Sequence, residues 1–147
     1  MPAIPPVITH IGVVGTVPDL PAEVVLHGDP LLVLRTGGVA PAGAHAWTIL
    51  GRGRLAEDMV TALARSGIRV RDQVEVRVDR SPLELVREWG GSPYGVLWQG
   101  RNTVARRLGP RTPIENVFMA GSHASPGAGL PSVGLSAALV AQVIGPA

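Results

Sequence analysis

Glycine and proline interrupt this chain so often that its apolar segments stay short. The sequence holds 19 Gly and 14 Pro among 147 residues, and they separate runs of Val, Leu, Ile and Ala. Both residues favour turns and are unfavourable inside helices and strands. Hydrophobic residues still make up 46% of the chain and charged residues only 16%, which excludes a disordered composition. We therefore expect a folded, loop-rich protein with the size of one domain or of two small units.

The charged residues and the absence of cysteine exclude several classes of function. All 13 basic residues are Arg, the net charge is only +2, and no basic run exceeds Arg106–Arg107. This is not the basic surface of a nucleic-acid-binding protein. Without Cys the chain has no disulfide, catalytic thiol or thiolate metal site, and its four scattered His lack the paired spacing of metal ligands.

The ends of the sequence predict neither a secretion signal nor a membrane span. Residues 1–6 contain three prolines and no basic residue, unlike a secretory signal. The weakly polar stretch 130–147 includes Pro131, Ser132, Ser136 and Gln142, and it falls short of the roughly 20 apolar residues that cross a bilayer. We expect a cytoplasmic protein.

The N-terminal half has the pattern of an antiparallel meander. Four β-rich segments, at residues 7–14, 23–27, 31–36 and 44–50, are separated by Gly and Pro turns. Segment 7–14 is apolar at almost every position, which predicts a strand buried on both faces and His10 as a hydrogen-bonded core residue.

Helical periodicity follows the meander. An apolar stripe predicts a helix over 54–66, with Glu57 and Asp58 in its first turn. Alternation predicts a half-exposed strand at 74–78, and Ser81-Pro82-Leu83-Glu84 predicts a capped helix that ends near Trp89. Residues 90–113 show no period and predict a long loop or a connection between two units.

The C-terminal part predicts a strand at 116–120, a glycine-rich loop and a helix at 133–144. Gly127 and Gly129 allow a ligand to approach the backbone, and the following helix N-terminus offers unpaired N–H groups to an anion or cofactor. By spacing alone the signal is weak, because Ser132 replaces the third glycine of a dinucleotide fingerprint. An ordinary turn between a strand and a helix is the other interpretation.

The letters of this part resemble a known family. RTPIENVFMAG (111–121) followed by SPGAGLP (125–131) is similar to the C-terminal end of the phytoene desaturase branch of FAD-dependent, amine-oxidase-like oxidoreductases, which reads TPIENLYLAG and then HPGGGVPG. GGSPYG (90–95) resembles the family's GGxxYG element, and residues 26–45 resemble its substrate-domain meander.

The resemblance implies a mixed α/β fold in two parts. Residues 1–92 would form a partial substrate domain with an antiparallel sheet and helices. Residues 93–147 would supply the last strand, loop and helix of a Rossmann-like FAD-binding domain. In the family this helix N-terminus faces the flavin edge where negative charge builds on reduction, so the cofactor implied is FAD. The implied flavin contacts are Gly121, Ser122, Pro126, Gly127, Ala128, Gly129, Leu130, Pro131 and Val133.

This sequence departs from the family in one decisive respect. The N-terminal GxGxxG half is missing, because GVVG at 12–15 is followed by Pro18 and Pro21 rather than by a helix. Ala124-Ser125 also stands where the family often has Thr-His, and Ser132 stands where it has Gly. We therefore expect the small subunit of a split enzyme, whose partner chain carries the GxGxxG half. The complex would move hydride from a C–H or C–N centre of a small organic substrate to flavin. A non-catalytic subunit that does not touch cofactor and a truncated relic are the alternatives.

Other side chains have two interpretations each. His123, inside the glycine-rich loop, would transfer a proton or fix the loop by a hydrogen bond. His45, Trp47 and Trp98 would line a substrate cavity or pack structurally. Four arginines would be solvated or would contact a partner chain or an acidic substrate: Arg101, Arg106, Arg107 and Arg111.

Overall fold

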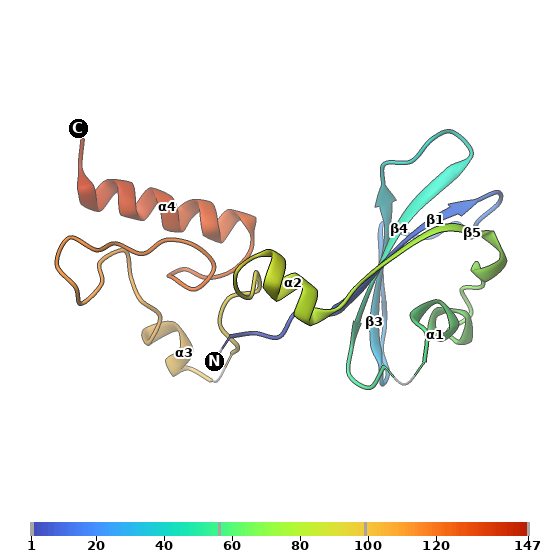
Figure 1. Cartoon of the computed structure of the whole chain (residues 1–147), viewed down its shortest axis with the longest axis horizontal. Helices are drawn as coiled ribbons and strands as arrows, with labels where there is room; N and C mark the ends of the chain where they lie inside the picture. The colour runs from blue at the N-terminus through green and yellow to red at the C-terminus, as the bar shows by residue number, and fades with distance from the viewer. Residues whose placement is uncertain (1, 56, 99, 147) are drawn as a thin grey trace. The chain divides into compact units, whose positions relative to one another are not determined.

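The structure is a computed structural model that describes residues 2–55, 57–98 and 100–146. Its backbone divides into two compact units (Figure 1). The first, the sheet unit, is Pro6–Pro82, and the second, the C-terminal unit, joins Met1–Pro5 to Leu83–Ala147. The sequence analysis divides the chain differently, into a substrate part (1–92) and a flavin-binding part (93–147). That division rests on the expected function of each part, so it stays a prediction.

Five antiparallel strands build the sheet unit: β1 (Val7–Val14), β2 (Glu23–Leu26), β3 (Leu31–Gly38), β4 (Ala44–Arg52) and β5 (Val74–Arg80). Their order is β2-β3-β4-β1-β5, so β2, β3 and β4 form a meander, whereas β1, the first segment of the expected four-strand meander, lies between β4 and β5 and not beside β2. The antiparallel sheet predicted from the sequence is thus confirmed. GVVG at 12–15 ends β1 and precedes another strand, as expected for a segment that is not a dinucleotide fingerprint.

The core of this unit lies on one face of the sheet. Alternate strand residues, among them Ile11, Leu34 and Ile49, pack there against helix α1 (Met59–Arg65). The prediction that β1 is buried on both faces is wrong, and so is the core position of His10. The side chain of His10 is exposed on the opposite face, and its Nδ1 lies 2.9 Å from Thr48 Oγ1. Side chains alternate between the faces of a strand, and α1 covers only one of them.

Helix α1 begins at Met59 and not at the predicted residue 54, so the prediction that Glu57 and Asp58 lie in its first turn is wrong. Asp58 is its N-cap, and its carboxylate accepts a hydrogen bond from the Thr61 amide at 3.0 Å. An Asp side chain that binds the amide three residues later satisfies a helix-end donor and marks the first turn. Ala56, inside the expected helix, lies outside the described residues. A short 3₁₀ helix, η1 (Arg71–Gln73), then leads into β5.

The C-terminal unit is assembled from loops and three helices. Helix α2 (Pro82–Glu88) begins at Pro82, as the capping pattern predicts, and α3 (Asn102–Ala105) is a short helix inside the segment expected to be a loop. Helix α4 (Leu130–Ile144) begins three residues before the expected start. None of the helices described in the structure is long and apolar enough to cross a membrane.

The first residues of the chain belong to this C-terminal unit. Ala3 N donates to Gly95 O at 2.8 Å, Pro2 forms an isolated bridge with Val96, and the Ser92 hydroxyl donates to Ala3 O. The sheet unit is therefore inserted between two segments of one discontinuous unit.

The strand expected at 116–120 does not form. The chain turns there instead: Arg111 and Phe118 make an isolated bridge, and Asn116 has a φ of 59°. Thr112 stabilises the turn, because its hydroxyl lies 2.9 Å from Val117 O and 3.2 Å from Ile114 N. A strand needs a neighbour for its backbone groups, and every strand of the described sheet belongs to the other unit.

Candidate functional site

Two of the segments that carry the family resemblance lie against each other in the C-terminal unit. Gly95, the last residue of GGSPYG, has a φ of 69°. A Cβ there would overlap the carbonyl oxygen of Ser122 and come within 3.2 Å of the Ala128 Cβ. Glycine is thus required at 95 by both conformation and space. The glycine-rich loop is held further by Ser125 N, which donates to Leu108 O at 2.9 Å.

The N-terminal turn of α4 is open. Its N-cap, Gly129, has a φ of 99°, and a Cβ there would meet no atom within 4 Å. Leu130 is 91% exposed, and no described side chain caps this helix end. The first amides of a helix have no intrahelical acceptor. This end of α4 therefore offers backbone donors and free space to a hydrogen-bond acceptor.

Gly127 has a different surrounding. A Cβ at this position would overlap the guanidinium group of Arg107, and the φ of 140° also favours glycine. Arg107 Nη1 donates to Pro126 O at 2.5 Å. The space beside Gly127 is thus filled by an arginine of the same chain, whereas the space beside Gly129 is open.

Two hydrogen bonds position the segment that contains His123. Gly121 N donates to the hydroxyl of Ser136 at 3.2 Å, and Ser136 is 1% exposed inside α4. His123 Nδ1 lies 3.2 Å from Ser122 Oγ. This contact supports a loop-fixing role for His123, and proton transfer stays a prediction. Sequence reasoning missed Ser136, whose only signal is a hydroxyl among small helix residues.

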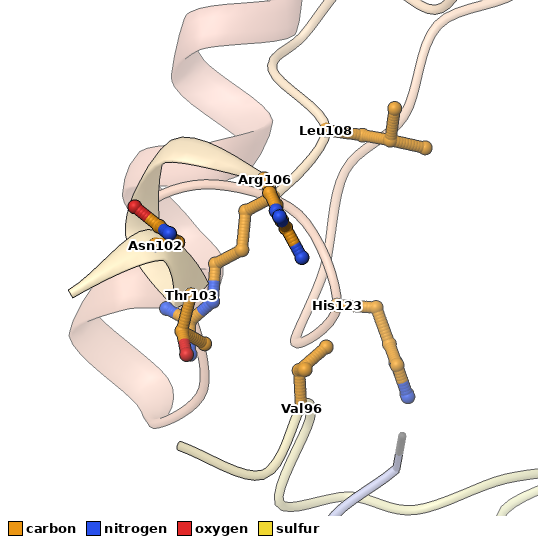
Figure 2. A pocket seen from close by; sticks show the side chains of 7 residues that line it. Val96, Asn102, Thr103, Arg106, Leu108 and His123 are labelled. Carbon is orange, nitrogen blue, oxygen red and sulfur yellow. The ribbon is translucent and has the colours of Figure 1, made fainter. Parts of the chain in front are cut away.

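A pocket of about 380 Å³ lies between α3 and the glycine-rich loop. Figure 2 shows the labelled side chains approaching one space from α3 and from the loops around it. The lining residues are Val96, Asn102, Thr103, Arg106, Arg107, Leu108 and His123. The pocket is therefore built from two guanidinium groups, an imidazole and two aliphatic side chains.

The candidates for a substrate cavity are divided between the units. His45 and Trp47 line one pocket of about 340 Å³ in the sheet unit, with Thr36 and residues 17–20. Trp47 is also part of the core and is 2% exposed. Trp98 belongs to the C-terminal unit and is 63% exposed. The structure thus brings His45 and Trp47 together and places Trp98 in the other unit.

The strongest electrostatic cluster is in the sheet unit, away from the predicted flavin residues in the sequence. Arg77 forms ion pairs with Asp58 and, at 2.8 Å, with Asp79, and the Thr9 hydroxyl donates to Asp79 Oδ1 at 2.6 Å. Burial by itself raises the pKa of Asp58, but hydrogen bonds from the Thr61 amide and Arg77 outweigh it, so the pKa lies below its usual value. The hydrogen bond from Arg77 lowers the pKa of Asp79 against a smaller effect of burial. This cluster joins α1 to β5 and has a structural role.

Searches with this chain found no matching family model, no matching curated protein and no matching solved structure.

Proposed function

We propose that this chain is the small subunit of a heteromeric FAD-dependent oxidoreductase. A second chain would supply the GxGxxG half, and the complex would transfer hydride from a C–H or C–N centre of a small organic substrate to flavin. The observation that carries the proposal is helix α4, which has no charged residue and leaves most of its surface without a covering layer.

Helix α4 lacks the charged face of an ordinary surface helix, and Gln142 is its one exposed polar side chain. No Asp, Glu, Lys or Arg occurs between Asn116 and Ala147, and Ser136 is the one residue of α4 that is buried. Leu135, Ala138 and Ala141 are exposed, with Leu135 at 53%. A helix that is hydrophobic all round normally lies inside a larger core. A second polypeptide covering α4 would supply that core, because obligate interfaces resemble a domain core cut in half.

The turn at residues 111–118 agrees with the same idea. In the family that the sequence resembles, this segment would be the last strand of a parallel sheet. A strand of that kind is stable only beside other strands. With strands from a partner chain, residues 116–120 would have neighbours for their backbone groups.

The open end of α4 fits a bound flavin. The backbone amides at Leu130 and Ser132 would face the cofactor edge, and Gly129 leaves room for its approach. The remaining residues that the resemblance assigns would line its surroundings: Gly121, Ser122, Pro126, Gly127, Ala128, Pro131 and Val133. FAD would supply the hydride acceptor, and this chain would contribute positioning and the positive end of a helix dipole.

Co-purification tests the proposal. The full chain carries an affinity tag and is co-expressed with a neighbouring reading frame that encodes an N-terminal GxGxxG. We expect a yellow complex of two polypeptides with a flavin absorption band. A colourless chain that retains no second polypeptide would overturn the proposal.

A matched pair of variants shows whether α4 makes the interface. Leu135→Arg places a charge on the exposed side of α4 and is expected to abolish retention of the partner, since burying an unpaired charge is strongly unfavourable. Val39→Arg makes the same change at a fully exposed loop position of the sheet unit and is expected to retain it. Equal retention by both variants would contradict the interface.

A non-catalytic subunit is the second candidate, and one observation favours it. The need for glycine at position 127 is explained without a ligand, because Arg107 fills the space beside it. Part of the glycine-rich loop would then serve folding alone. A complex of two polypeptides without flavin would identify this function.

A further inference from the structure

We propose that the 380 Å³ pocket beside α3 binds the oxyanion group, a phosphate or carboxylate, of a small molecule with a short apolar part. Every residue that lines the pocket belongs to the C-terminal unit, and the proposal requires neither flavin nor a partner residue in the site. It rests on the charge of the pocket, on the incomplete pairing of Arg107 and on the aliphatic side chains in its wall.

The pocket carries positive charge without an internal counter-charge. Arg106 and Arg107 both line it, and neither forms an ion pair with a carboxylate in the described part of the chain. The acidic residues of this unit are Glu84, Glu88 and Glu115, and none of them lines the pocket. Two positive charges that line one pocket repel each other, so an anion bound in the pocket would be attracted by both and would reduce this repulsion.

Arg107 is held in position before any ligand arrives. Its Nη1 donates to Pro126 O at 2.5 Å, and Gly127 makes room for its guanidinium group. Its Nε is buried, and none of the described residues accepts a hydrogen bond from it. Because the Nε is covered by protein atoms, a ligand in the pocket would not bind it but would offset the charge of the guanidinium group, which has no carboxylate partner among the described residues. A fixed guanidinium group also loses little entropy on binding an oxyanion.

The other lining residues fit an organic anion better than a free ion. Asn102 and His123 add polar groups, whereas Val96 and Leu108 form an aliphatic part of the wall (Figure 2). Small-molecule sites combine apolar walls with a few polar groups and have volumes of about 300–1,000 Å³. The pocket is at the lower end of that range, which favours a small ligand.

The test is a calorimetric titration of the full chain with butyl phosphate, butyrate and inorganic phosphate, at constant ionic strength. We expect saturable binding of at least one butyl compound to one site, and tighter binding of butyl phosphate than of inorganic phosphate. The two butyl compounds distinguish a phosphate ligand from a carboxylate ligand. Absence of saturable binding for all three would overturn the proposal.

Three variants locate the binding. Arg106→Gln and Arg107→Gln are each expected to weaken binding about tenfold or more, because charge-assisted hydrogen bonds are lost. Arg101→Gln removes the same charge from an exposed residue that does not line the pocket. The affinity of this variant for the ligand should stay within about twofold of that of the unaltered chain. Arg106 is exposed, so its variant gives a decisive result even if Arg107→Gln disturbs the loop. Unchanged affinity in Arg106→Gln, or an equal loss in Arg101→Gln, would contradict the assigned site.

Discussion

Arg77 is the residue of the sheet unit that pairs with two carboxylates whose pKa values are lowered. It pairs with Asp58 at the start of α1 and with Asp79 on β5, and the pKa of both carboxyl groups lies below the usual value of 3.8. The unfolded chain therefore takes up protons first as the pH falls. This contribution to stability is complete above the usual carboxyl pKa and is lost as the pH falls through the lower pKa of the folded state.

We accordingly expect the free energy of unfolding to decrease between pH 5 and the acid range below the usual carboxyl pKa. Asp79→Asn should have a lower free energy of unfolding than the unaltered chain at neutral pH. Its free energy of unfolding should also decrease less on acidification, because one of the two carboxyl groups with a lowered pKa is gone. Urea unfolding of both proteins at neutral and acid pH measures the difference. Equal losses in the two proteins would contradict a stabilising role for the Asp79–Arg77 pair.

Gly95 allows a second residue-scale prediction with a close control. Gly95 and Gly90 both have positive φ, at 69° and 63°, so alanine strains the backbone at either position. Only at Gly95 would the new methyl group overlap a carbonyl, that of Ser122, whereas the space at Gly90 is open. We expect Gly90→Ala to cost about 1 kcal/mol and Gly95→Ala clearly more. Hydrogen exchange of residues 92–96 and 121–125 measures this, and equal protection in both variants would show that the contact is unimportant.

Among the elements, α4 allows the sharpest test of the proposed flavin site. Asp in place of Leu130 would lie in the first helical turn, where a negative charge stabilises a helix by about 0.3–1 kcal/mol. The same charge would repel a cofactor edge that becomes negative on reduction. We expect Leu130→Asp to keep the helix and to lose flavin from the purified complex, and Leu130→Asn to retain it.

Absorbance per complex and far-ultraviolet circular dichroism measure these two effects separately. If Leu130→Asp and Leu130→Asn retained flavin equally, the cofactor would not approach this end of α4. The structural role of α4 as an interface would still be tested by Leu135→Arg.

A comparison of the predicted and the observed elements shows which of them the sequence pattern can predict. Strand positions followed from alternating apolar residues and Gly or Pro turns, because the sheet unit contains every neighbour that its strands need. His10 was misplaced because an apolar sequence does not say which face a helix covers. Residues 116–120 were predicted as a strand from composition alone, and the described chain offers them no strand to pair with. The pocket near α3 escaped prediction because Arg106, Arg107 and His123 come together only through the loop that Gly95 packs against.

At the scale of the whole molecule, the two units differ in how much of their core they contain. The sheet unit buries Val13, Leu34, Ile49 and Leu63 completely. The C-terminal unit instead exposes large apolar residues, including Trp89, Trp98 and Ile114. A unit that contains its own core can fold independently, whereas exposed apolar patches are typical of surfaces that interact with other molecules.

We therefore expect residues 6–82 to fold without the rest of the chain. Trp47 is the tryptophan of this fragment and lies in its core, so its fluorescence reports the packed state. The fragment should unfold cooperatively in urea, with a midpoint close to that of the sheet unit in the full chain. A fragment 83–147 should show no such transition. A gradual change of Trp47 fluorescence without a midpoint would disprove independent folding of the sheet unit.

The discontinuity of the C-terminal unit has a consequence for biosynthesis. Residues 2–3 leave the ribosome before the sheet unit, yet the backbone groups that they bind, at residues 95–96, are made only after the whole sheet unit. At usual rates of translation this interval is about 5–20 s. The nascent sheet unit has time to form while the leading segment is still unpaired. A chain released before residue 95 would then hold a complete sheet unit, while the backbone groups of residues 2–3 would lack the partners that they have in the structure.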